Sequence, residues 1–123
     1  MRRYKYYNRN PDHVHLLDCV CRAISTATGL SYDAVDNLLR ITASEYDCDK
    51  LCLCCYYNLL EDILCYHRID CHFKQTVEDV AAEYPLNKLI IRVDAHLTSS
   101  INGTILDIWD CSQEFVDCFW IVQ

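Results

Sequence analysis

The sequence is poor in residues that make sharp turns and in positive charge. Only two glycines and two prolines occur among 123 residues, so the few tight turns are easy to locate. Lysine and arginine number 11 against 18 acidic residues, a formal net charge of −7 that argues against wide binding to a phosphate backbone. No apolar run approaches the roughly 18 residues of a membrane helix. We therefore expect neither nucleic acid nor a membrane as a partner.

Cysteine, in contrast, is abundant, with ten residues. The charged start of the chain lacks the apolar segment of a signal peptide, so we expect a reducing, cytoplasmic location. In that compartment the cysteines act as thiols or metal ligands rather than as a disulfide frame. The length fits a single domain, and the 52% hydrophobic composition fits a globular one.

Helical periodicity dominates the first two thirds of the chain. Apolar positions recur at helical spacing after Asp18, a residue type that caps helix starts, and Gly29 predicts the end of this helix. A second helix is predicted after Ser31, a third over about residues 48–66, a short strand at "IDCHF", and a fourth helix after Thr76.

Strand patterns follow Pro85. The run "KLIIRV" and the final "FVDCFWIV" predict strands, and between them Asn102-Gly103 gives the strongest hairpin signal of the chain. Helices followed by antiparallel strands indicate an α+β fold. We expect one domain over residues 1–123, composed of an irregular arm over 1–17, a mainly helical part over 18–84 and antiparallel strands over 87–123.

The hairpin predicts a specific convergence of side chains. If Asn102 and Gly103 are the centre of a type I′ turn, His96, Asp107 and Trp109 project to one face. Asp107 is then a diagonal neighbour of His96 and can fix the tautomer of its imidazole and stabilise the protonated form. Trp109 would exclude water from this pair.

Two cysteines compete for the role of nucleophile. Cys19 follows the predicted cap Asp18, where the helix dipole and free amides favour a thiolate. Cys21 points about 200° away on the same helix, so it cannot share that role and is assigned to the core. Together with the hairpin, Cys19, His96 and Asp107 compose a candidate Cys–His–Asp catalytic site.

With these residues in place, the chain resembles a smaller version of the papain-like cysteine peptidases. That family places its nucleophilic cysteine at the start of an N-terminal helix and its histidine and Asn or Asp on later strands of an antiparallel sheet. More narrowly, three segments resemble short phage and gut-bacterial proteins that have a D-C-x-x-R-A-I helix and an H…D-x-W-D hairpin. The segments are "NPDHVHLLDCVCRAISTATGLSYDAV", "TVEDVAAEYP" and "HLTSSINGTILDIWDCS". The resemblance spans most of the chain and is weakest in its cysteine-rich middle.

The resemblance implies a papain-like fold and a cysteine hydrolase that cleaves a peptide, isopeptide or related acyl bond. If phage-encoded, the protein would act on a host or phage protein in the host cytoplasm, and no cofactor is implied. Papain-like enzymes place an oxyanion-hole Gln six residues before the cysteine, and here that position is His13. Asn8, Asn10 and His13 remain candidates beside the Cys19 amide, and Trp109 is a candidate substrate contact.

Two other functions stay open. A papain-like binding protein without turnover, such as an inhibitor of host defence, would keep the same residues. A zinc-stabilised adaptor would use the central cysteines, because i, i+4 and i+7 positions share one helix face. The candidate zinc ligands are Cys48, Cys52, Cys55 and Cys71.

Overall fold

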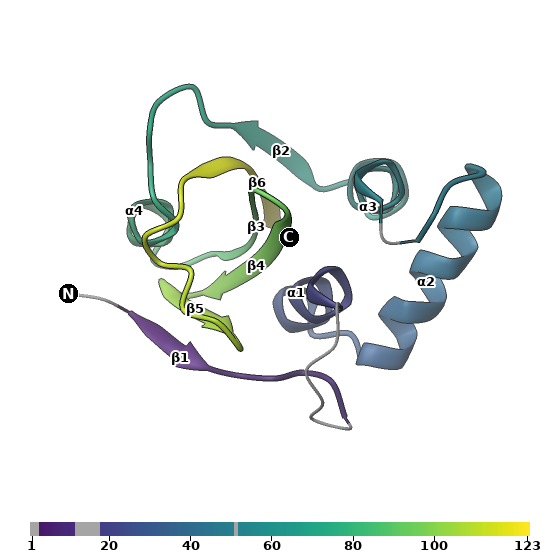
Figure 1. Ribbon diagram of the computed structural model, residues 1–123, viewed down its shortest axis with the longest axis horizontal. Coiled ribbons are helices and arrows are strands. Elements are labelled where there is room, and N and C mark those ends of the chain that lie inside the picture. Colours follow the sequence, from purple (N-terminus) through teal and green to yellow (C-terminus); the bar gives the residue numbers. More distant parts are fainter. Residues whose placement is uncertain (1–2, 12–17, 51) are drawn as a thin grey trace.

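The computed structural model describes residues 3–11, 18–50 and 52–123, and within them the chain adopts an α+β fold (Figure 1). Six strands form one mixed sheet in the order β1-β5-β4-β3-β6-β2. The strands are β1 (Tyr4–Tyr6), β2 (His67–Asp70), β3 (Lys88–Val93), β4 (His96–Ile101), β5 (Thr104–Asp107) and β6 (Val116–Val122). The helices are α1 (Cys19–Thr28), α2 (Tyr32–Glu45), α3 (Leu53–Asn58), the π-helical η1 (Leu59–Ile63) and α4 (Val77–Glu83).

Local capping explains where most helices begin and end. Gly29 ends α1 in the left-handed region at φ 79°, which glycine adopts at little cost. The Ser31 hydroxyl accepts a hydrogen bond from the Ala34 amide at 3.1 Å at the start of α2. Thr76 and Asp79 form the reciprocal capping box of α4. These three boundaries confirm the sequence predictions.

The third helix differs from the expected span of 48–66. It begins only at Leu53, because Asp47 takes a left-handed conformation at φ 51° and Cys52 is an extended N-cap residue. The helix then continues without interruption from α3 into η1. A helix is thus present over part of the expected span, but the periodicity did not reveal where the backbone first becomes helical.

The sheet also corrects the expected division of the chain. Residues 4–6 of the arm are not irregular, because β1 pairs with β5, and it does so in parallel. The strand predicted at "IDCHF" corresponds to β2, shifted toward the N-terminus, and it pairs with β6 at the opposite edge. The sheet is therefore mixed rather than purely antiparallel. Both edge pairings join residues far apart in sequence, which local patterns do not encode.

The sheet buries apolar side chains on both faces. Figure 1 shows α1, α2 and α3 on one side of the strands and α4 on the other. Ile90, Leu97 and Trp120 belong to the core beneath α1. Leu89 and Ile91, which flank Ile90 on β3, belong to the core beneath α4. The period-2 alternation of β3 thus supplies both layers, which explains its nearly continuous apolar sequence.

The β4–β5 hairpin has the expected register. Ile101 pairs with Thr104, Ser100 with Ile105 and Ser99 with Leu106. Asn102 and Gly103 both have positive φ, at 51° and 82°, as a type I′ turn requires. Within the described residues, no helix is long and apolar enough to cross a membrane.

Candidate active site

Cys19 is the first residue of α1 and lies half-buried at the face of the sheet. Its thiol lies beside the His96 imidazole and the backbone amide of Leu97 on β4, and the three residues line one pocket. Cys21 is buried on another side of the same helix and donates its thiol hydrogen to the Tyr32 carbonyl at 3.3 Å. The helical geometry therefore separates the two cysteines as expected.

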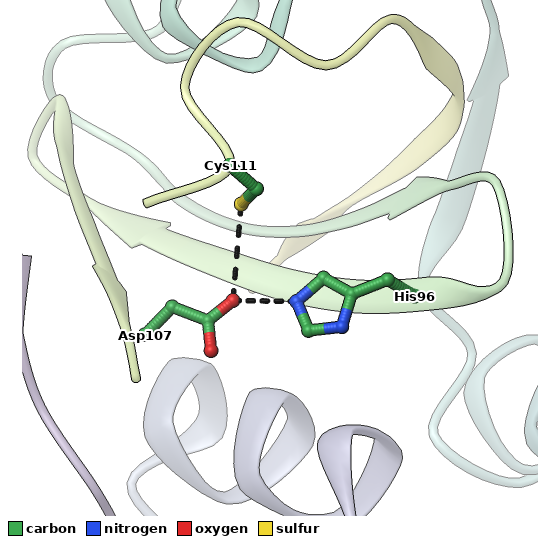
Figure 2. Close-up of side chains that lie close together, drawn as sticks. All are labelled: His96, Asp107 and Cys111. Atoms are coloured by element: carbon green, nitrogen blue, oxygen red, sulfur yellow. Dashed lines mark hydrogen bonds and ion pairs between the residues drawn. The ribbon is translucent and has the colours of Figure 1, made fainter. Parts of the chain in front are cut away.

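His96 and Asp107 meet across the hairpin. The Nε2 atom of His96 lies 2.6 Å from Oδ2 of Asp107, the distance of a strong charge-assisted hydrogen bond. Figure 2 shows the second ring nitrogen on the side of the imidazole that faces the α1 ribbon. His96 thus binds the carboxylate through one nitrogen and has the other available for Cys19. The predicted diagonal pairing of His96 and Asp107 is present.

The Asp107 carboxylate is held by two further groups. Its Oδ1 atom accepts a hydrogen bond from the Ile108 amide at 2.7 Å. Arg22 Nη1 lies 3.5 Å from the same oxygen, while Arg22 Nε lies 2.7 Å from Asp18 Oδ1. Arg22 is buried, so this ion pair links the helix of the candidate nucleophile to the strand of the carboxylate. Arg22 thus pairs with Asp18 at the start of its own helix and also reaches Asp107 on β5.

The electrostatics of the cluster favour a thiolate and an imidazolium. Burial alone would raise the pKa of Cys19, but hydrogen bonds from His96 and Leu97 and the charges of His96 and Arg22 lower it. Burial alone would lower the pKa of His96, but hydrogen bonds to Asp107, Cys111 and Cys19 raise it to about 11. The pKa of Asp107 is lowered by His96 despite its burial.

A small pocket opens beside Cys19. It has a volume of about 210 Å³, and its walls include the apolar side chains of Val20, Leu53 and Leu97. Trp109 lies on the His96 ring, edge to face, with centroids 5.0 Å apart, and keeps 46% of its surface exposed. Trp109 therefore covers the imidazole as the hairpin pattern predicted.

The predicted oxyanion donors are placed differently. Asn10 is buried, but its Nδ2 donates to Asp18 Oδ2 at 3.1 Å, and it does not line the Cys19 pocket. Asp18 occupies the N-cap position without capping through its side chain, because Asn10, Arg22 and Tyr32 bind its carboxylate. His13 lies outside the described residues.

The four candidate zinc ligands are not brought together. Cys48, Cys52 and Cys55 pack in the core beneath α1, whereas Cys71 packs in the core beneath α4, on the other face of the sheet. Cys52 accepts a hydrogen bond from the Cys55 amide at 3.3 Å, and Cys55 donates to the Leu39 carbonyl at 3.4 Å. Cys52 thus caps α3, and Cys55 fills the core beside it as a small apolar residue does.

Sequence patterns missed one residue of the site. Cys111 is fully buried, and its Sγ lies 3.8 Å from Oδ2 of Asp107 on the side away from α1 (Figure 2). The only signal was its position four residues after Asp107 in "DIWDC". The segment leaves the strand there, so periodicity does not predict where the thiol points.

Comparisons with known proteins give no match to the chain among protein-family models, curated proteins or solved structures.

Proposed function

We propose that the protein is a small cysteine hydrolase of papain-like type. The observation that supports this most directly is that His96 hydrogen-bonds to Asp107 and shares a pocket with Cys19, with the pKa of Cys19 lowered and that of His96 raised. Nucleophile, base and orienting carboxylate in hydrogen-bond reach of one another are the signature of an activated thiol. The position of the thiol at the start of a helix adds the attraction of free backbone amides.

In the proposed reaction, the Cys19 thiolate attacks an acyl carbonyl in the pocket. His96 then gives its Nδ1 proton to the leaving group and later takes a proton from water, which hydrolyses the thioester. Asp107 holds the imidazole through Nε2 and stabilises its charged form. The backbone amide of Cys19, at the first turn of α1, stabilises the oxyanion. Peptide and isopeptide bonds of a protein substrate are the preferred targets.

The test is acylation of the full chain by an activated ester, followed by peptide mass mapping. We expect an acyl adduct on Cys19 that decays in water and is absent from Cys19→Ala. His96→Asn should keep the thiol and lose both formation and decay of the adduct. An adduct spread over the exposed Cys54 and Cys65, with none on Cys19, would overturn the proposal.

A papain-like binding protein without turnover is the second candidate. The hydrogen bond of Asn10 to Asp18 supports it, because that amide is engaged away from the Cys19 pocket. In that case Cys19 would form the adduct, but the adduct would persist instead of decaying. The decay rate of the acyl adduct therefore separates the two functions.

A further inference from the structure

The His96–Asp107 pair has a thiol on each of its two sides. Cys19 approaches from α1, and Cys111 approaches from the loop after β5, on the side of α4 (Figure 2). The proposed hydrolysis uses only Cys19. Cys111 is fully buried, donates a hydrogen bond to Asp107, lies within 4.8 Å of the His96 ring nitrogen, and has no part in that reaction.

We propose that His96, Asp107 and Cys111 form a binding site for Zn²⁺ that blocks the imidazole. One nitrogen, one oxygen and one sulfur atom of these residues all lie within 4.8 Å of one another. This mixed donor set suits zinc, which binds imidazole, carboxylate and thiolate. Three protein ligands would leave the fourth tetrahedral position for water.

The distances are close to those of a loaded site. A tetrahedral zinc with bonds of about 2.0–2.3 Å holds its ligand atoms roughly 3.3–3.7 Å apart. The Asp107 Oδ2 to Cys111 Sγ distance is already 3.8 Å. The His96 Nε2 to Asp107 Oδ2 distance of 2.6 Å must widen, since the ion replaces the proton between these atoms. The His96–Asp107 side must widen by about 0.7 Å, and the third donor-to-donor distance lies within 4.8 Å.

The surroundings supply the supporting contacts that metal ligands need. The Ile108 amide fixes the second oxygen of Asp107, and Cys19 can accept the Nδ1 hydrogen of His96. Thr98 Oγ1, near the Asp107 carboxyl, is buried and has no partner that meets hydrogen-bond criteria among the described residues. The side chain of His96 keeps 14% of its surface exposed, which gives an ion access from solvent.

The charge of the buried cluster does not change on binding. Zn²⁺ displaces the Nε2 proton of the His96 imidazolium and the thiol proton of Cys111, so two protons leave as two positive charges enter. His96 is then a neutral ligand with a single hydrogen on Nδ1. It cannot give this hydrogen to a leaving group without becoming an imidazolate, so hydrolysis stops.

The test measures metal binding directly and does not depend on turnover. The full chain, reduced with a phosphine, is titrated with Co²⁺ and Zn²⁺, and the zinc-loaded form is examined by X-ray absorption. We expect one bound ion, a thiolate-to-cobalt charge-transfer band, and one sulfur in the zinc shell with the rest nitrogen and oxygen. Two or three sulfurs, or no binding, would overturn the proposal.

Matched serine variants locate the sulfur. Cys111→Ser should remove the charge-transfer band and weaken zinc binding by at least about tenfold. Loss of a residue that only hydrogen-bonds to a metal ligand already costs about this much affinity, and loss of a ligand should cost more. Cys19→Ser and Cys52→Ser should keep the band, and serine is a good N-cap at position 52. Loss of the band in Cys19→Ser would place the metal on the catalytic pair, and loss in Cys52→Ser would place it at α3. If Cys111→Ser does not fold, the sulfur count of the native chain decides.

Discussion

Two helices among the described residues have a cysteine at their start, as first residue of α1 and as N-cap of α3, and only the cysteine of α1 has an imidazole beside it. Cys19 opens α1 and faces His96 and the Leu97 amide. Cys52 caps α3, and its sulfur accepts a hydrogen bond from the Cys55 amide of the same helix. The two helix starts offer similar dipoles, so the difference comes from the sheet. A helix start favours a thiolate, but only a base brought by another element makes it a candidate nucleophile.

The neighbouring thiols of each region sharpen this contrast. Burial raises the pKa of Cys21 to about 12, although it lies two residues from Cys19 on the same helix. Burial likewise raises the pKa of Cys55 beneath α3. Both are core residues, and the nearby Lys50 offsets only part of the rise at Cys21. Of these three thiols, only Cys19 has a lowered pKa.

The largest expected effect concerns the alkylation of Cys19. At pH 6 we expect Cys19 to react with iodoacetamide faster than the exposed Cys54 and Cys65, because its thiolate is stabilised. His96→Asn should slow Cys19 about 100-fold, since a thiol of ordinary pKa is almost wholly protonated at that pH. Residue-resolved mass spectrometry measures all three rates in one sample. Equal rates for the three thiols would remove the distinction between the two helix starts.

The stability of the site should follow pH in two opposite directions. The pKa of His96 rises from 6.5 to about 11 on folding, so its stabilisation is complete below pH 6.5 and is lost as pH rises toward 11. The pKa of Cys19 falls below 9.0, so its stabilisation is present above pH 9.0 and is lost as pH falls through the folded value. Above pH 6.5 the two contributions change in opposite directions between the folded pKa of Cys19 and pH 9.0, so they offset each other there.

Urea titrations across this range measure the balance. We expect a plateau in the free energy of unfolding that ends in a decline above pH 9.0. In Cys19→Ala only the His96 slope remains, so the decline should begin near pH 6.5. An unchanged plateau in this variant would show that the two groups are not coupled.

The α3 region should respond in stability rather than in reactivity. Cys55→Ser places a hydroxyl in the core and should lower the free energy of unfolding by about 1–3 kcal/mol. Cys54→Ser, at an exposed neighbouring position, should change it by less than about 0.5 kcal/mol. Cys19 alkylation should be unaffected by both. Urea unfolding and the alkylation assay together test the separation of the two regions.

The smallest expected effect lies in the hairpin that supplies His96 and Asp107. Gly103 has φ 82°, and an added Cβ would lie 3.3 Å from the Arg3 guanidinium and 3.6 Å from the Ala81 carbonyl. Gly103→Ala should therefore lower the free energy of unfolding by about 1 kcal/mol. Asn102→Gly, which removes a left-handed asparagine, is the matched control and should change it by less. A stable Gly103→Ala chain with normal Cys19 alkylation would show that the turn does not limit the site.

Part of the site was predictable because it depends on local rules. The Asn102-Gly103 turn fixes the strand register, and the register places His96 and Asp107 on one face. Three residues escaped prediction or were placed differently. Cys111 lies in an irregular loop, Asn10 turns to Asp18, and Arg22 reaches Asp107 across 85 residues of chain.

The sequence by itself determined the end of α1, the caps of α2 and α4 and the β4–β5 hairpin, since each depends on residues a few positions apart. Only the tertiary structure decided that β1 and β2 join opposite edges of the sheet and that α1 lies where Cys19 meets His96. Those arrangements rest on packing between distant segments, because the free energy of such contacts depends on how whole faces fit together. For the same reason, the sequence did not show why Cys19 has a histidine beside it and Cys52 does not; the packing of α1 on β4 decides this.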